Sequence, residues 1–77
     1  MFEYNICNQP DEEIFNKQCL AIEKHIKHLS KNPILDDVDG SKIQVYYSEK
    51  GKITVYNDYS IGAVYVNADF DLLPYFQ

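Results

Sequence analysis

The sequence predicts a small α+β domain, a two-layer β-α-β-β-β arrangement with one amphipathic helix packed on a short, mostly antiparallel sheet. Residues 42–67 contain three runs rich in Ile, Val, Tyr and Thr, separated by turn residues, a pattern typical of consecutive strands. Residues 11–30 instead repeat apolar side chains at helical spacing. With 77 residues, 45% of them hydrophobic, we expect residues 1–77 to form one domain.

The first strand and the helix are predicted from the start of the chain. An apolar/polar alternation over residues 2–6 predicts a short strand. Helix-start signals follow: Asn8 can accept from free backbone N–H groups, and Pro10 precedes three acids that complement the helix dipole. The helix is predicted to run to about Ser30, because Asn32 and Pro33 end it. Its apolar stripe is Phe15, Cys19, Ile22, Ile26 and Leu29, with Ile14 at the margin.

The turn at Glu49-Lys50-Gly51 decides which strand residues face the helix. We expect a three-residue loop with Gly51 in the left-handed conformation, so that Ser48 pairs with Lys52. A two-residue loop would shift the register by one residue and divide the apolar side chains between both faces. In the favoured register, the helix-facing residues are Ile43, Val45, Tyr47, Ile53 and Val55.

The second turn, residues 57–60, completes the sheet. A four-residue loop would pair Tyr56 with Ile61 and turn Gly62, Val64 and Val66 toward the helix. The opposite face would then present Gln44, Tyr46, Lys52, Thr54, Tyr56, Ile61, Ala63 and Tyr65. Two interpretations of that face stay open. Either the apolar tail after Asp69 folds back over it, or the tyrosines stay exposed as a binding patch.

The composition indicates an acidic, cytoplasmic protein. Twelve acids face seven lysines, there is no arginine, and the net charge is −5. Such a surface repels phosphate backbones and attracts basic proteins, so we expect a basic protein partner and no direct binding of nucleic acid. The sequence has no long apolar run and no leader-like start, so we expect no membrane contact. Cys7 and Cys19 are expected to be reduced and buried.

No pattern of residues in the sequence indicates catalysis or metal binding. A calcium loop aligned on Gly40 would lack carboxylates at its first and last positions, which favours a solvated acidic turn over residues 34–40. His25 and His28 would flank one side of the helix, without a cysteine or carboxylate at ligand spacing. We therefore expect a protein that binds rather than catalyses, with no metal and no cofactor.

In size, acidity and tyrosine content, the chain is similar to small inhibitor proteins of bacteria and phages, the immunity proteins for nuclease toxins and the anti-defence proteins. That resemblance implies a stoichiometric inhibitor that blocks the basic groove of a nuclease or another nucleic-acid enzyme. In this hypothesis carboxylates steer association and tyrosines anchor the complex. The predicted partner-binding residues are Asp36, Asp37, Asp39, Tyr46, Tyr56, Asp58, Tyr59, Tyr65, Asp69 and Asp71.

Two other functions remain open. The chain could be a structural or adaptor module that assembles with itself, or bridges proteins, through its sheet edge or its tyrosine face. It could also be a small regulatory or ligand-binding domain. The salt dependence of binding distinguishes the inhibitor from the self-assembling module, because charge-driven inhibition weakens with salt and apolar self-assembly does not.

Overall fold

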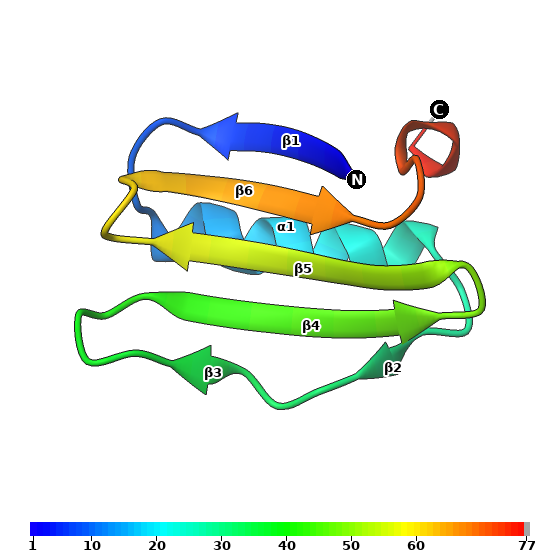
Figure 1. Cartoon of the computed structure of the whole chain (residues 1–77), viewed down its shortest axis with the longest axis horizontal. Coiled ribbons are helices and arrows are strands. Elements are labelled where there is room, and N and C mark those ends of the chain that lie inside the picture. Colours follow the sequence, from blue (N-terminus) through cyan, green and yellow to red (C-terminus); the bar gives the residue numbers. More distant parts are fainter. Residues whose placement is uncertain (77) are drawn as a thin grey trace.

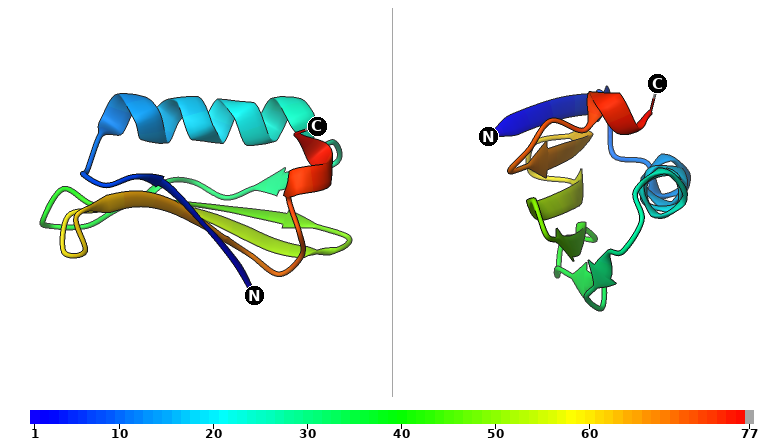
Figure 2. Two further views of the ribbon diagram at one scale, coloured as in Figure 1. Left: turned by 90° about the horizontal axis from the view of Figure 1, so that it is seen from above. Right: turned by 90° about the vertical axis from the view of Figure 1, so that its right-hand side faces the viewer.

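The computed structural model describes residues 1–76 and has an antiparallel sheet with one long helix on one of its faces (Figures 1 and 2). The strands are β1 (Phe2–Cys7), β2 (Ser30–Lys31), β3 (Leu35–Asp36), β4 (Lys42–Ser48), β5 (Gly51–Asp58) and β6 (Ala63–Ala68). The helices are α1 (Glu12–His25) and the short 3-10 helix η1 (Leu73–Tyr75). The strand order is β1-β6-β5-β4-β2, with β3 also paired to β4, which confirms the predicted α+β class. In residues 1–76 neither helix is long and apolar enough to cross a membrane.

The start of α1 is fixed by its N-cap. Asp11 is extended (φ −156°, ψ 111°), and its Oδ1 accepts a hydrogen bond from the Ile14 N–H at 3.0 Å. Asn57, buried in β5, accepts from the Asp11 N–H at 3.0 Å through its own Oδ1. Glu12 and Glu13 follow in the first turn, where carboxylates interact favourably with the helix dipole. The cap therefore both begins the helix and attaches it to the sheet.

The end of α1 differs from the prediction. The helix stops at His25, because Ile26 is already extended (φ −116°, ψ 119°). His28 then takes a left-handed conformation with φ +61°, which histidine adopts more readily than most residues. The chain can in this way leave the helix layer early and pair β2 with β4. The predicted end near Ser30 is wrong, and so is the expectation that His25 and His28 flank one side of the helix.

The β4–β5 hairpin has a two-residue loop rather than the predicted three-residue loop. Ser48 pairs with Gly51, not with Lys52. Gly51 has φ +140°, and a Cβ at this position would lie 2.6 Å from the Cβ of Asp69. The glycine is therefore required as the first residue of β5, where Asp69 passes close by, and not as a loop residue.

In this register, the β4 residues that were predicted to face the helix face away from it, and their neighbours face the helix. Tyr46 lies opposite Ile53, and Gln44 lies opposite Val55, all on the helix side. The prediction that Ile43, Val45 and Tyr47 face the helix is wrong, because these residues alternate with Tyr46 and Gln44 and point to the other face. Gln44 is buried because β2 and its connection supply an acceptor: the Gln44 Nε2 donates to the Asn32 carbonyl at 2.6 Å.

The pairing of β6 also differs, but its faces are as predicted. Tyr56 pairs with Tyr65 rather than with Ile61, and residues 59–62 form the loop. The shift is an even number of residues, so side chains keep their face. Val64 and Val66 point toward the helix, whereas Ile61 lies in the exposed loop.

The core fills the space between α1 and the sheet. It consists of Phe15, Cys19, Ile22, Ile26, Tyr46, Ile53, Val55, Val64, Val66, Ala68 and Leu72. The last of these comes from the tail, which Tyr4 holds in place. The Tyr4 hydroxyl donates to Asp71 Oδ1 at 2.7 Å and accepts from the Leu72 N–H at 2.9 Å.

The tail lies on the helix side of the molecule, at the C-terminal end of α1 (Figure 2). The ring of Phe76 is 4.8 Å from the ring of His25, measured between centroids. The interpretation in which the tail covers the tyrosine face is therefore wrong. In residues 1–76 no helix or tail segment covers the face of the sheet opposite α1.

Candidate functional site

Two loops and the start of α1 meet at one end of the sheet (Figure 1). The Ser41 Oγ accepts a hydrogen bond from the Tyr59 N–H at 2.9 Å, and the Ser60 Oγ donates to Asp39 Oδ2 at 3.3 Å. These bonds join the β3–β4 loop to the β5–β6 loop. We call this region the acidic end and define it by the carboxylates of Glu12, Asp36, Asp37, Asp39 and Asp58.

Hydrogen bonds from the loop backbone hold three of these carboxylates, and Asp37 Oδ1 accepts one from the Val38 N–H at 2.7 Å. Asp58 Oδ1 accepts from the N–H groups of Ser60 and Ile61 at 2.9 and 3.1 Å. Asp39 Oδ1 accepts from the Ser41 N–H at 2.9 Å. The bonds from the backbone and the hydroxyl of Ser41 hold the pKa of Asp39 below its usual value. Asp39 is therefore fully ionised at neutral pH, in an orientation that the loop has already set.

Lys42 lies among these carboxylates. Its Nζ pairs with Glu12 Oε1 and is 3.9 Å from Asp36 Oδ1. The hydrogen bond and the charge of Glu12 raise the pKa of Lys42. One ammonium group thus stands against five carboxylates, so the acidic end keeps a strong negative charge.

A pair of tyrosines continues the acidic end onto the uncovered face of the sheet. The rings of Tyr56 and Tyr65 stack with their centroids 4.5 Å apart and 14° between their planes. The Tyr65 hydroxyl donates to Asp58 Oδ2 at 3.0 Å. Partial burial and this hydrogen bond raise the pKa of Tyr65 to about 12, so the hydroxyl remains a donor at neutral pH. A hollow of about 160 Å³ lies between Tyr56 and the acids, and its lining includes Asp37, Asp39, Ser41, Ile43 and Asp58.

The rest of the uncovered face mixes apolar and aromatic side chains with polar ones, among them Lys52 and Asn67. Because opposite residues of paired strands share a face, Val45 lies beside Thr54, and Ile43 lies beside Tyr56. Tyr47 is the exposed aromatic residue at the far end of β4. We call this surface the open face and define it by Ile43, Val45, Tyr47, Thr54, Tyr56 and Tyr65.

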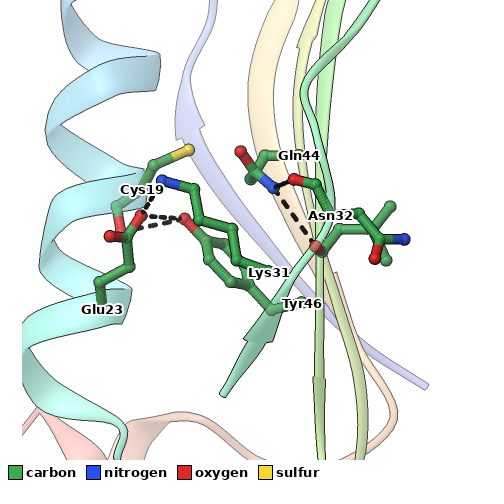
Figure 3. A network of polar contacts seen from close by, with 7 residues as sticks. Cys19, Glu23, Lys31, Asn32, Gln44 and Tyr46 are labelled. Atoms are coloured by element: carbon green, nitrogen blue, oxygen red, sulfur yellow. Dashed lines mark hydrogen bonds and ion pairs between the residues drawn. The ribbon is translucent and has the colours of Figure 1, made fainter.

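Tyr46, a predicted anchor, does not belong to this surface. It is 0% exposed, and its hydroxyl donates to Glu23 Oε2 at 2.6 Å and lies 3.3 Å from the Cys19 carbonyl oxygen (Figure 3). The Lys31 Nζ, from β2, is 3.0 Å from the same Glu23 oxygen. The expectation that Tyr46 is exposed to a partner is wrong, because the two-residue hairpin loop turns it into the core.

Asp69 and Asp71 lie at the opposite end of the sheet from the acidic end. Asp69 Oδ2 accepts from the Lys52 N–H at 2.9 Å, and Asp71 Oδ1 accepts from Tyr4 and from the Leu73 N–H. Both carboxylates hold the tail. The structure therefore brings together Asp36, Asp37, Asp39, Tyr56, Asp58, Tyr59 and Tyr65, and separates Asp69, Asp71 and Tyr46 from them.

Sequence reasoning missed two contributions to this region. Glu12 joins the acidic end because the helix start lies beside Lys42. Tyr47, Ile43 and Val45 belong to the open face, which the two-residue loop would have indicated.

Within residues 1–76, no group of three or more His, Cys, Asp or Glu side chains could hold a metal ion. Cys7 and Cys19 are free thiols, and burial raises the pKa of Cys19.

No protein-family model matches the sequence, and neither a curated protein nor a solved structure matches it significantly. The fold and the surface define the class of the molecule: an acidic α+β domain with an uncovered, tyrosine-bearing sheet face.

Proposed function

We propose that this protein is an acidic inhibitor, of the immunity or anti-defence type, that binds and blocks a basic, nucleic-acid-handling partner protein. One observation carries the proposal: the acidic end and the tyrosine pair form one continuous surface, joined by the hydrogen bond from Tyr65 to Asp58. A partner that approaches this surface meets negative charge and aromatic contact area together.

The carboxylates supply the attraction. A groove that binds phosphates carries clustered Lys and Arg side chains, and a complementary acidic surface raises the rate of encounter at low salt. Asp39 and Asp58 are already fixed by loop hydrogen bonds, so less side-chain entropy is lost when they meet a cation.

The tyrosines supply the contact area that slows dissociation of the complex. Tyr56 and Tyr65 are half-buried and stacked before binding, so their rings are preorganised. Tyr59 is exposed at the acidic end, where its ring packs against Gly40. Aromatic side chains of this kind are the usual anchors of protein interfaces.

The experiment is affinity capture from the native host with the whole chain as bait, followed by an activity assay of the captured protein. A variant that carries Asp37→Asn is compared with a control that carries Glu49→Gln. Both remove one charge, but the control removes it in the β4–β5 loop, away from the acidic end.

We expect a basic nucleic-acid enzyme that the chain inhibits at equal stoichiometry, with weaker capture by the Asp variant and unchanged capture by the control. Equal capture by both variants and the wild type would show that the acidic end is not used. Capture of a partner whose activity is unaffected would reject inhibition and favour the adaptor function.

A further inference from the structure

β1 is an edge strand with one side unpaired. It pairs with β6 on its other side, over Phe2–Cys7. The opposite edge of the sheet is interrupted, because β2 and β3 have two residues each and are separated by a stretch that contains Pro33. β1 itself contains neither proline nor lysine, the residues that commonly protect sheet edges. In residues 1–76 it is therefore the long edge that is open to another strand.

The helix side of β1 is apolar and borders a groove. Phe2 and Ile6 are 42% and 39% exposed. Tyr4 lies between them on the same side, because Phe2 and Tyr4 pair with the helix-facing Ala68 and Val66, and Ile6 lines the same groove as Tyr4. A groove of about 270 Å³ runs between β1, α1 and the tail, and its lining includes Tyr4, Ile6, Ala21, Val66, Leu73 and Phe76. A strand added to β1 would project alternate side chains toward this groove.

We propose that the added strand is β1 of a second copy of this chain, paired antiparallel about a twofold axis at Tyr4. Tyr4 then lies opposite Tyr4 of the second copy, Phe2 lies opposite Ile6, and Glu3 lies opposite Asn5. The two sheets become one, with both helices on the same side. Isologous pairing of this kind is the commonest form of a homodimer.

The residues of β1 select this register. Opposite residues of an antiparallel pair share a face, so centring the axis on Tyr4 brings the exposed Phe2 and Ile6 together beside the groove. An axis at Glu3 would place two carboxylates opposite each other, which is destabilising. An axis at Asn5 would set Glu3, on the open-face side, against Cys7, which the bulge turns to the helix side.

The charge distribution fits the same arrangement. β1 runs along the length of the sheet, and a twofold axis at its centre sends the two acidic ends to opposite extremes of the dimer (Figure 1). The net charge of −5 on each chain still opposes association at low salt. Dimerisation is therefore expected to strengthen with salt, the reverse of the proposed binding to a basic partner, and each can fail without the other.

A matched pair of variants at Asn5 tests the proposal. In the dimer, Asn5→Lys places an ammonium group opposite Glu3 twice, and Asn5→Glu places a carboxylate there twice. Sedimentation equilibrium from micromolar to millimolar chain should show a reversible monomer–dimer equilibrium. We expect a several-fold lower dissociation constant for Asn5→Lys and a several-fold higher one for Asn5→Glu. Monomers at millimolar concentration in both the wild type and Asn5→Lys would overturn the proposal.

Disulfide formation tests the register itself. In a background with Cys7→Ser and Cys19→Ala, chains carrying Glu3→Cys are mixed with chains carrying Asn5→Cys and oxidised. Opposite positions in an antiparallel pair are close enough for a disulfide, so the mixture should give a cross-linked heterodimer and neither chain alone should cross-link. Cross-linking of the Glu3→Cys chain with itself would contradict the register. Cross-linking through Tyr47→Cys instead would assign self-association to the open face. Thermal unfolding of each variant confirms that it is folded.

Discussion

At the scale of single residues, Tyr46 makes both apolar and polar contacts in the core that its place in the sequence does not indicate. Its ring fills the core, and its hydroxyl bonds the ionised Glu23 on α1. Burial, followed by this hydrogen bond, raises the pKa of Tyr46 above its ordinary value, so the hydroxyl donates at any physiological pH. The side chain therefore links helix and sheet through both apolar and polar contacts.

Tyr46→Phe should lower the free energy of unfolding by about 1–3 kcal/mol, because it removes one charge-assisted hydrogen bond and keeps the ring. Tyr47→Phe is the matched control on the exposed neighbour and should be neutral. Chemical denaturation of both variants is the measurement. Equal stability of Tyr46→Phe and wild type would show that the bond to Glu23 contributes nothing.

The same bond predicts a pH dependence. The hydrogen bond from Tyr46 lowers the pKa of Glu23 below its ordinary value of 4.5, burial opposes this shift, and Lys31 supports it. A depressed pKa in the folded state gives stability that is complete above the unfolded value and is lost as the pH falls through the folded value. As the pH falls below about 5, the wild type should therefore lose more free energy of unfolding than Tyr46→Phe does. Parallel pH curves for the two proteins would contradict this assignment.

The orientation of β4 could not be predicted from its residues alone. Ile43 and Val45 are more apolar than Gln44 and Tyr46, so apolar patterning favours the wrong face. The correct face depends on partners from distant segments: Glu23 for Tyr46, and the Asn32 carbonyl for Gln44. Gly51 was recognised as special, but its close approach to Asp69 is a tertiary contact.

At the scale of elements, local sequence signals determine where α1 begins, and tertiary contacts determine where it ends. The acids are local signals, so the start was predictable to within a turn, although the N-cap is Asp11 and not Asn8, whose Oδ1 accepts from Asn5 instead. The end was not, because the pairing of β2 with β4 takes the chain out of the helix before Asn32. Short strands such as β2 and β3 carry no periodic signal and could not be found.

Ile26 tests the contact between helix and sheet. Ile22 and Ile26 are buried as predicted, although Val45 is not among their neighbours in the core. Ile26 is 4% exposed, so Ile26→Ala should cost about 2–5 kcal/mol of stability. Leu20→Ala, at a residue 65% exposed, should change stability by less than about 0.5 kcal/mol. Thermal melts of the two variants should differ widely, and similar melting temperatures would contradict this packing.

His28 tests the helix end. Because its φ is positive, His28→Gly should be at least as stable as wild type, whereas the β-branched variant His28→Val should lose about 1–2 kcal/mol. The comparison by denaturant unfolding separates backbone strain from loss of the imidazole, which both variants share. A His28→Val variant as stable as His28→Gly would place this residue in an ordinary conformation.

At the scale of the whole molecule, the fold brings together carboxylates that are far apart in the sequence. Asp39 lies in the β3–β4 loop and Asp58 ends β5, and the two are brought together by the hydrogen bonds of Ser41 and Ser60 between adjoining loops. Composition alone indicated an acidic surface. It could not show that Asp69 and Asp71 hold the tail at the other end, because their partners come from β5, β1 and the tail backbone.

The tyrosine pair should control the lifetime of the complex with the captured partner. Tyr56→Ala and Tyr65→Ala should each speed dissociation, since an aromatic anchor at an interface can contribute about 2 kcal/mol or more. Circular dichroism should show both variants folded, because neither residue lies in the core between α1 and the sheet. Unchanged dissociation rates in both folded variants would remove these tyrosines from the interface.

The most direct test of the proposed function is the rate of association with the captured partner at two salt concentrations. Wild-type chain is compared with a variant carrying Asp36→Asn, Asp37→Asn and Asp39→Asn. If the acidic end steers binding, the variant should associate more slowly than wild type at low salt, and its rate should depend less on salt. Association of the variant at the wild-type rate, with the same salt dependence, would contradict the account and leave acidity as a property of solubility alone.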